Sequence, residues 1–358
     1  MSVDGIGVGR IKNLLAKFRT TERVFSASIN ELMDVEGFSV NLAQRIHSCN
    51  KHRGDIEKIV NDELERLYKL NASLISLWDD EYPSLLRKIF DPPLLLYTKG
   101  HFKDVDDYCI AVVGTRQPTN YGKIQTEKIV TELAQQKITI VSGMARGIDT
   151  IAHKTALKNK TRTIAVLGSG LNVIYPPENK KIYDDIAESG VIISEYCLDA
   201  KPDAVNFPKR NRIISGLSLG CLVVETGATG GAMQTAAFAL DQGREVFAIP
   251  GNLGVRQAEG TNLLIQKGEA ELVASAEDIF LELELKLKPV IGKNIPKPDI
   301  ELNIFEDKIL SQLNDDPIQI DMLAVKVNLS TSDCLVHLLS LEFKGVVRQL
   351  PGKTFIRV

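Results

Sequence analysis

The chain has 358 residues, which is enough for two or three domains of ordinary size. Hydrophobic residues make up 44% of it and charged residues 25%, which argues against a disordered chain and against a membrane-spanning one. The formal net charge of −3 excludes a broadly basic surface. Five scattered cysteines without a CxxC pair predict neither a disulfide framework nor a zinc site. Because no export signal is visible, we expect a cytoplasmic protein with free thiols.

Residues 1–60 are polar and carry short helical patterns. Two turns in this segment, Gly5-Ile-Gly7 and Gly37-Phe-Ser39, resemble helix-hairpin-helix turns, in which glycine amides meet a DNA phosphate. Ser39 stands at the second glycine position of the second copy, and a small helical module for protein contacts is an equally good interpretation. Residues 61–107, with several aromatic residues and prolines, form a predicted connector.

Residues 108–281 form the predicted core, in which short apolar runs alternate with longer mixed stretches. Runs that are apolar on consecutive residues indicate strands covered on both faces, and the stretches between them can hold crossover helices. Alternation of this kind predicts a parallel, doubly wound α/β sheet. The predicted strands are 109–113, 138–141, 163–167, 191–193, 221–224 and 245–249, and two predicted helices cover 121–136 and 149–158.

The carboxyl ends of these strands, where doubly wound sheets bind ligands, are rich in glycine and arginine. Glycines let a backbone approach an anion, and helix N-termini add positive partial charge at the same edge. The pattern therefore predicts an anion-binding rim built from several loops. Its glycine-rich loops are Gly114-Thr-Arg116, Ser142–Asp149, Gly168-Ser-Gly170 and Glu225–Gly231, and its cations are Arg116, Arg146, Lys209, Arg210 and Arg212.

Some chemistries fit this rim poorly. A dinucleotide fingerprint needs a third glycine where Val173 stands, so a dehydrogenase is a poor match. Asp149 and His153 could share a helix face as a catalytic or metal pair, but we favour Asp149 as a cap of a helix starting at Thr150, with His153 bonded locally. Glu195 and Glu225 end strands, and we expect both to accept hydrogen bonds from loop N–H groups.

Single-stranded nucleic acid needs cations for its phosphates and flat side chains for its bases. The stretch Phe207-Pro-Lys-Arg-Asn-Arg212, expected in a loop at the sheet edge, offers both. The alternative is a solvated helix start whose arginines pair with acids. Tyr121 and Tyr175 could stack in the same way or lie in the core, and the sequence does not choose between these.

Residues 282–302 carry charges and three prolines and predict a linker. Residues 303–358 predict three helices and a hairpin with its turn at Pro351-Gly352, which is a winged-helix pattern. A DNA-reading winged helix would carry arginine or lysine on its third helix, but this one offers Thr331, Ser332, Asp333, His337 and Ser340. We therefore expect a protein-interaction or accessory module.

Several motifs in a fixed order resemble the DNA-processing protein A (DprA/Smf) family over nearly the whole chain. They are Asp80-Glu-Tyr-Pro83, Asp91-Pro-Pro93, Gly114-Thr-Arg116, Ser142–Asp149 with Ala152-His153, Gly168-Ser-Gly170 with Tyr175-Pro176, Phe207–Ser218, Val223-Val-Glu225 and Gly243–Gly251.

The resemblance implies an extended Rossmann-like, mostly parallel sheet, a SAM or helix-hairpin-helix-like N-terminal domain and a C-terminal winged helix. It implies a homodimer that is not an enzyme, uses no cofactor or metal, protects single-stranded DNA and loads the RecA recombinase onto it in natural transformation. The implied DNA-binding residues are Gly114, Arg116, Gly143, Arg146, Gly147, Gly168, Gly170, Phe207, Lys209, Arg210, Asn211 and Arg212.

Two other functions fit the sequence less well. Rossmann-like phosphoribohydrolases carry a related glycine-rich stretch with a glutamate where this chain has Ala237, which leaves no evident acid–base residue. A pure interaction scaffold would need apolar surfaces that the sequence does not locate. The net charge of −3 does not oppose DNA binding, because the local field in a cleft decides binding and the five rim cations should converge.

Overall fold

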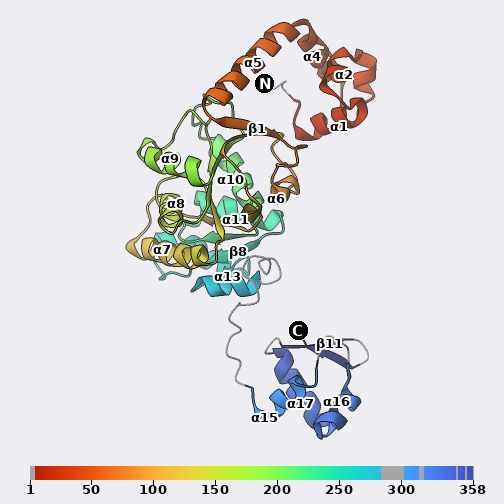
Figure 1. The fold of residues 1–358 in the computed structure, drawn as a ribbon, viewed down its shortest axis with the longest axis vertical. Coiled ribbons are helices and arrows are strands. Elements are labelled where there is room, and N and C mark those ends of the chain that lie inside the picture. The colour runs from red at the N-terminus through yellow and green to blue at the C-terminus, as the bar shows by residue number, and fades with distance from the viewer. Residues whose placement is uncertain (1–4, 284–301, 314–317, 344–345, 351–352, 358) are drawn as a thin grey trace. The chain divides into compact units, whose positions relative to one another are not determined.

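The computed structural model describes residues 5–283, 302–313, 318–343, 346–350 and 353–357 (Figure 1). The chain divides into two compact units, Met1–Lys293 and Asn294–Val358, and each is described by itself. Most of the predicted linker, residues 284–301, lies outside the described residues. No helix in the described part of the chain is long and apolar enough to cross a membrane.

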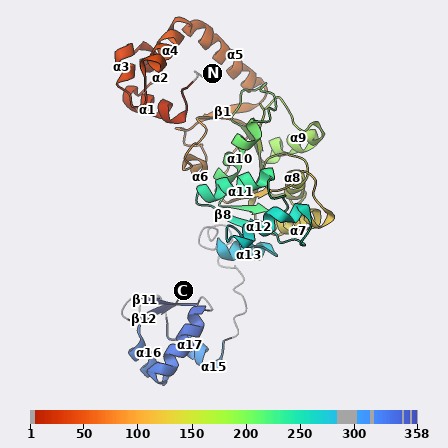
Figure 2. The same ribbon diagram turned by 180° about the vertical axis from the view of Figure 1, so that it is seen from behind.

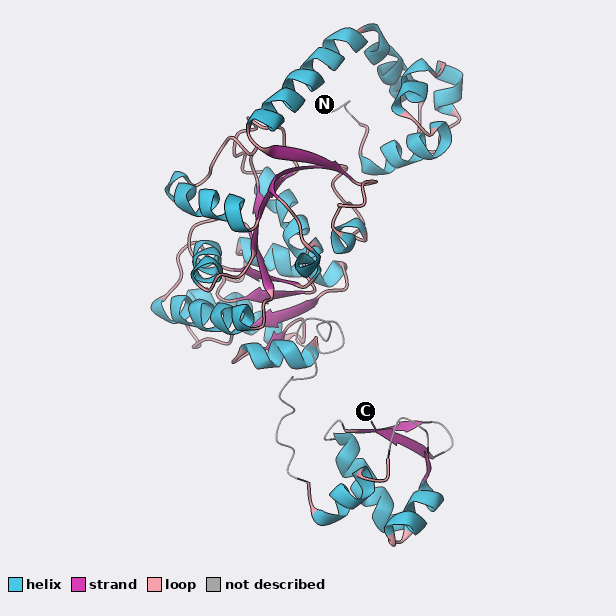
Figure 3. Ribbon diagram, in the orientation of Figure 1, coloured by secondary structure: helices cyan, strands magenta, loops and turns pink. Residues whose placement is uncertain are grey.

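The first unit is built on a mixed sheet of nine described strands in the order β1-β2-β6-β5-β4-β3-β7-β8-β9 (Figure 3). Pairs from β6 to β9 are parallel, whereas β1 with β2 and β2 with β6 are antiparallel. The predicted doubly wound, mostly parallel fold is confirmed. The strands are β1 (Ala72–Ser76), β2 (Leu95–Gly100), β3 (Cys109–Val113), β4 (Thr139–Ser142), β5 (Thr163–Leu167), β6 (Val191–Ser194), β7 (Gly220–Val223), β8 (Glu245–Ala248) and β9 (Glu271–Leu272).

Helices cover both faces of this sheet. They are α6 (Ser84–Arg87), α7 (Asn120–Gln135), α8 (Ile148–Lys158), α9 (Lys180–Ser189), α10 (Asn206–Gly216), α11 (Gly231–Asp241), α12 (Glu259–Gln266) and α13 (Ala276–Glu282). Three short 3₁₀ turns accompany them at Asp104–Asp107, Pro177–Asn179 and Arg256–Ala258. Figures 1 and 2 show α7 and α8 on one side of the sheet, and α10 and α11 on the other.

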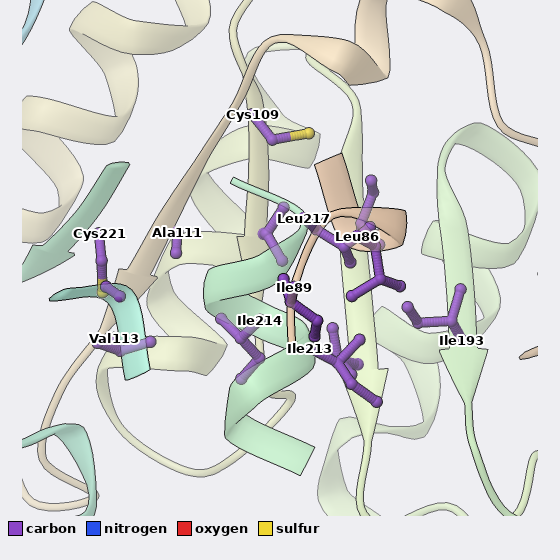
Figure 4. Packing of buried hydrophobic residues seen from close by; sticks show 14 of the residues in the cluster. Leu86, Ile89, Cys109, Ala111, Val113, Ile193, Ile213, Ile214, Leu217 and Cys221 are labelled. Atoms are coloured by element: carbon purple, nitrogen blue, oxygen red, sulfur yellow. The ribbon is translucent and has the colours of Figure 1, made fainter. Parts of the chain in front are cut away.

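Alternate residues of β3 explain why its apolar residues run consecutively. Ala111 and Val113 pack with Ile213 and Ile214 of α10 in one cluster, which Figure 4 shows. Val112 belongs instead to the cluster formed with α7, α8 and α13 on the opposite face. A strand buried on both faces needs an apolar residue at every position, and all five residues of β3 are buried.

The segment predicted as a connector supplies β1 and β2 to the sheet. The two strands pair from Ala72 with Lys99 to Ser76 with Leu95, and β2 continues onto β6 through Tyr97 and Ser194. Strand β1 escaped prediction because it is mostly half exposed and carries a weak pattern. Strand β2 escaped although Leu96, Tyr97 and Thr98 are buried in sequence.

The sheet has a topological switch point beside β3. From β3 the chain continues to β4, β5 and β6 on one side, then returns to place β7 on the other. The ends of β3 and β7 are joined by hydrogen bonds from Val224 N to Val113 O (3.0 Å) and from Thr115 N to Glu225 O (2.6 Å). Loops leaving these two strands diverge, which opens a crevice at the carboxyl edge of the sheet.

The N-terminal helices contain two hairpin turns with matching backbones. Gly5 and Gly37 both have positive φ angles, 84° and 81°. Gly7 and Ser39, the following helix N-caps, are both extended, with φ angles of −95° and −93°, so a serine is accommodated at the second position. The guanidinium of Arg10 donates to the carbonyls of Gly5 and Gly37 and ties the turns together. The helices are α1 (Val8–Phe18), α2 (Thr21–Ser26), α3 (Ile29–Met33), α4 (Val40–Lys51) and α5 (Arg53–Lys69).

The second unit has the predicted winged-helix arrangement. Its three helices pack on a small sheet of three described strands in the order β10-β12-β11. The predicted hairpin is formed by β11 and β12, and its turn at Pro351-Gly352 lies outside the described residues. The elements are α15 (Ile304–Leu310), β10 (Ile318–Gln319), α16 (Ile320–Val327), α17 (Thr331–Phe343), β11 (Val347–Leu350) and β12 (Thr354–Arg357).

Candidate nucleic-acid interface

A cleft of about 740 Å³ lies at the switch point between β3 and β7. Its lining includes five of the twelve residues predicted to bind DNA, namely Gly114, Arg116, Phe207, Arg210 and Asn211. The other seven lie outside that lining: Gly143, Arg146, Gly147, Gly168, Gly170, Lys209 and Arg212. The structure therefore brings together a smaller set than the sequence predicts.

The half-buried ring of Phe207 lies among two cations and a second aromatic ring. The guanidinium carbons of Arg116 and Arg210 lie 5.7 and 5.9 Å from its centroid, within cation–π range. The ring of Tyr175 is 5.8 Å away and tilted by 45°, and Tyr175 also lines the cleft. Of the two tyrosines left open by the sequence, Tyr121 instead donates its hydroxyl to Pro250 O at 2.9 Å.

The stretch from Phe207 to Arg212 is helical, not a loop. It forms the first two turns of α10, which begins at Asn206. Pro208 made a loop the expected structure. In the helix it stands at the third position, where an N–H group would have no partner within the helix, so proline is tolerated there. Residues three and four apart share a helix face, so Phe207, Arg210 and Asn211 line the cleft together.

Arg210 is a buried cation that is only 4% exposed. Its Nη1 donates to Gly143 O at 2.6 Å and to Val166 O, and its Nε donates to Asn211 Oδ1 at 3.2 Å. A Cβ on Gly143 would lie 2.6 Å from the guanidinium nitrogens, so this position requires glycine. Burial lowers the pKa of Arg210 to about 10, opposed by the charge of Asp149, and the group remains charged at neutral pH.

Gly168 lies against the ring of Phe207. A Cβ on it would be 2.8 Å from the ring carbon Cδ1, a contact that could be relieved only by moving the aromatic side chain. Gly143 and Gly168 therefore act behind the cleft, where they give room to Arg210 and Phe207. These two glycines permit close approach, but the groups that approach them are the protein's own side chains, Arg210 and Phe207.

Asp149 and His153 depart from the expected cap. Helix α8 begins at Ile148, and Oδ2 of Asp149 accepts from the N–H groups of Gly143 (3.1 Å) and Ala145 (3.3 Å) in the preceding loop. Burial raises the pKa of Asp149. Nδ1 of His153 lies 2.7 Å from Thr163 Oγ1 on β5, and burial lowers its pKa to about 3.

Arg212 is engaged outside the cleft lining. Its Nη1 and Nη2 donate to the two carboxylate oxygens of Glu195 at 2.9 and 2.6 Å, and its Nε donates to Asp91 O at 3.0 Å. Glu195 thus pairs with an arginine and not with loop amides. Tyr82 fixes the same loop by donating its hydroxyl to Pro93 O at 2.8 Å. The connector motifs around Tyr82 and Asp91 support α10 from outside the cleft.

The remaining predicted residues lie around this centre. Arg146 forms a half-exposed ion pair with Glu178, and Lys209 is exposed on α10. Gly147 is the N-cap of α8 with a φ of 78°, and Gly170 packs against the carbonyls of Cys197 and Leu198. Arg116 is therefore the exposed cation of the described cleft lining, and no ion pair joins it to a carboxylate among the described residues.

Glu225 behaves as predicted. Its Oε2 accepts from Thr119 N at 2.8 Å, and its Oε1 accepts from the Thr119 hydroxyl at 2.5 Å. The side chain is 3% exposed and thus fixes the loop that carries Arg116. Ala237, where a nucleotide-cleaving relative would carry its glutamate, is absent from the cleft lining.

One wall of the cleft comes from a loop that the sequence analysis placed in the predicted rim, but not among the DNA-binding residues. The lining also includes Thr226, Gly227, Gly230, Gly231, Gln234 and Thr235, from the loop after β7 and the first turns of α11. The glycine-rich run after the strand was a usable signal for the loop. Nothing in the sequence singles out Thr235, because its placement depends on how α11 packs.

Comparison with known proteins identifies the family. The model of the DNA recombination-mediator protein A family matches residues 73–284. The chain belongs to this family. Models of the DprA winged-helix domain and of a SAM-like helix-hairpin-helix tandem match residues 296–353 and 1–49. The sequence-based assignment to the DprA/Smf family is confirmed, together with both terminal modules.

Relatives and solved structures agree with this. Protein Smf of Synechocystis is 34% identical over 99% of this chain and 96% of its own. DNA processing protein DprA of Bacillus subtilis is 44% identical over 58% of this chain and 70% of its own. The structure of DprA from Streptococcus pneumoniae matches with a TM-score of 0.65 at 34% identity, covering 78% of this chain and 94% of that one. A DprA structure from Helicobacter pylori, described by its single-stranded DNA binding mode, matches with a TM-score of 0.55 at 32% identity, covering 61% and 97%.

Proposed function

We propose that the cleft binds single-stranded DNA, with Arg116 contacting a phosphate and Phe207 stacking on a base. The observation that carries this proposal is the exposed guanidinium of Arg116, 5.7 Å from the ring centroid of Phe207 at the cleft. A cation beside an aromatic face is the combination that single strands require. The single-strand binding named for the Helicobacter pylori relative supports it.

Arg210 and Asn211 have a positioning role in this proposal. Arg210 is bonded to two backbone carbonyls, and Asn211 to Arg210. Together they hold Phe207 and the cleft floor in place, while Arg116 is the group free to meet the strand. A compact pocket whose described lining offers an exposed cation and aromatic rings predicts binding with little sequence preference, because every base offers a flat face and every nucleotide a phosphate.

Fluorescence anisotropy tests this proposal, with short oligothymidylate and duplex DNA titrated over a salt series. We expect a preference for the single strand and a fall in log K with log salt of about 0.7 per phosphate contact. Arg116→Ala should weaken binding and flatten this slope. Lys154→Ala, which removes an exposed cation from α8, is the matched control and should bind like wild type. Binding of Arg116→Ala equal to wild type would show that the cleft is not the DNA site.

The wider role extends this binding to DNA processing. Within the proposal the protein is a cytoplasmic homodimer without enzymatic activity that protects incoming single strands and passes them to the RecA recombinase in natural transformation. Its Bacillus subtilis and Streptococcus pneumoniae relatives are named DNA processing proteins, which supports the general role. A pull-down of RecA by Arg116→Ala separates the two activities, because a variant that no longer binds DNA should still capture RecA through protein surfaces.

A further inference from the structure

One wall of the cleft carries hydrogen-bond donors that have no role in the contacts described so far. The loop after β7 and the start of α11 contribute Thr226, Gly227, Gly230, Gly231, Gln234 and Thr235 to the same lining as Arg116 and Phe207. This wall is therefore in reach of any strand that the cleft holds, although it was not among the predicted DNA-binding residues.

The N-terminus of α11 is open. Its N-cap, Gly230, offers no side-chain cap, and its first turn contains no acidic residue. In the described part of the chain, the N–H groups of Gly231 and Ala232 have no backbone or side-chain acceptor. Helices usually satisfy such groups with a serine, threonine or aspartate cap, and uncapped N–H groups with the helix dipole behind them attract anions.

Thr235 provides a second and independent observation. It lies four residues after Gly231, on the same helix face, and is only 2% exposed. Thr126 on α7 shows how a buried helical hydroxyl is usually satisfied, since it donates to the carbonyl four residues back at 2.6 Å. Thr235 makes no such bond with any described residue and lines the cleft. The hydroxyl of Thr235 therefore reaches the cleft without a protein partner, and it is available to a ligand bound there.

We infer that a phosphate of the bound strand lies at the N-terminus of α11, held by the N–H groups of Gly231 and Ala232 and by the hydroxyl of Thr235. This inference rests on the proposed function and extends it to a second contact. The donors are compact and uncharged, and no acidic residue stands in the first turn, which suits phosphate oxygens. A cleft of about 740 Å³ has room for more than one nucleotide, so this phosphate is distinct from the one at Arg116.

Two substitutions remove these donors with little structural cost. Gly231→Pro deletes one N–H at the first helical position, which tolerates proline. Gly230 has φ −69° and ψ 157°, as the residue before a proline prefers, and the space around Gly231 is open. Thr235→Val deletes the hydroxyl and keeps the shape. Gly231→Ala and Thr235→Ser restore the donors and are the matched controls.

The test measures the affinity of each full-length variant for oligothymidylate with a 5′-hydroxyl over a salt series, with thymidine 5′-monophosphate as a second probe. We expect each donor deletion to weaken strand binding about tenfold, as loss of a charge-assisted hydrogen bond does. Because these donors carry no formal charge, the slope of log K against log salt should change much less than it does in Arg116→Ala. Both controls should bind like wild type, and circular dichroism should show all variants folded.

The outcomes separate the two proposals. Wild-type affinity in both deletion variants, with weak binding by Arg116→Ala, would overturn this inference and leave the proposed function standing. Wild-type binding by Arg116→Ala would overturn the proposed function itself. A response confined to thymidine 5′-monophosphate would also overturn the inference, because the wall would then hold a free nucleotide and not the strand.

Discussion

Helix α10 at the cleft and helix α17 in the winged helix both occupy positions where DNA-binding folds place contact residues, yet they present different surfaces. Helix α10 carries Lys209, Arg210 and Arg212, but two of these cations are buried on partners within the protein. Helix α17 has neither lysine nor arginine. It exposes Val336 at 64% and Leu339 at 42% to solvent.

The difference teaches that neither a fold nor a run of basic residues identifies a DNA contact. Burial and existing partners decide whether a cation is free to meet a phosphate. By this criterion the described lining of the cleft has one free guanidinium, that of Arg116, supported by the buried one of Arg210. The surface of α17 matches the protein-interaction or accessory role that we propose for the winged helix, because it offers apolar contact without lysine or arginine.

The largest effect on stability is expected when a buried cation, Arg212, is replaced and compared with an exposed one, Arg146. Arg212→Gln leaves Glu195 without its bidentate partner and should lower the free energy of unfolding by about 2–4 kcal/mol. Urea unfolding measures this. The matched control, Arg146→Gln, removes an exposed ion pair with Glu178 and should change stability little. Equal losses in the two variants would remove the distinction between buried and exposed cations.

Acid should lower the free energy of unfolding of the first unit, which contains the cleft, through the protonation of His153. Burial lowers the folded-state pKa of His153 to about 3, below its ordinary value near 6.5. Between these values the unfolded chain binds a proton that the folded chain does not. Stability is therefore lost as the pH falls, at up to about 1.4 kcal/mol per pH unit. The raised pKa of Asp149 opposes this trend in acid.

Urea unfolding from pH 7 to pH 4 checks the effect of His153. The variant His153→Asn lacks the titrating ring and should show a shallower loss of stability than wild type. Parallel pH profiles for the two proteins would mean that His153 is protonated equally in the folded and unfolded states.

Phe207→Ala should reduce affinity for oligothymidylate by about 1–3 kcal/mol, the cost of losing one base–aromatic stack. Anisotropy titration at fixed salt gives this number. Phe207→Tyr keeps the flat ring and should retain most of the affinity. Binding of Phe207→Ala equal to wild type would show that Phe207 does not stack on a base. It would also weaken the contrast between the cleft and α17.

The smallest effect is expected in the winged helix. The double variant Val336→Ala, Leu339→Ala trims two exposed side chains of α17, so we expect wild-type stability and wild-type affinity for oligothymidylate. The same titration and urea unfolding measure both quantities. A loss of DNA affinity as large as that of Phe207→Ala would place α17 in the DNA interface and erase the comparison.

Most of the fold was predictable because burial on both faces leaves a strong mark. Strands β3 and β5 begin and end where their apolar runs do. Strand β1 was missed because a partly exposed edge strand needs no continuous apolar run. Strand β2 has such a run, Leu95-Leu-Tyr97, but it lies among the prolines of the segment predicted as a connector. The stretch starting at Phe207 was taken as a loop because a proline early in a helix gives the same local signal as one in a turn.

The residues at the centre of the candidate site were predictable from the sequence, but the residues that pair with its side chains were not. Gly114, Arg116 and Phe207 follow from strand ends and residue chemistry. The pairing of Arg212 with Glu195 joins two elements whose approach depends on packing, so a basic side chain in the motif could not be distinguished from a DNA ligand. The wall at Thr235 escaped for the same reason, because an unpaired hydroxyl is visible only once its neighbours are placed.

The bond between Thr119 and Glu225 spans 106 residues of chain, and it fixes the loop that carries Arg116. During synthesis, Arg116 and its strand emerge long before β7 and α11 exist to complete the cleft. A nascent chain therefore has no complete cleft until β7 and α11 have been made, because contacts between such distant residues require a long loop to close. A complete cleft is thus present only once both ends of this segment have been synthesised and packed.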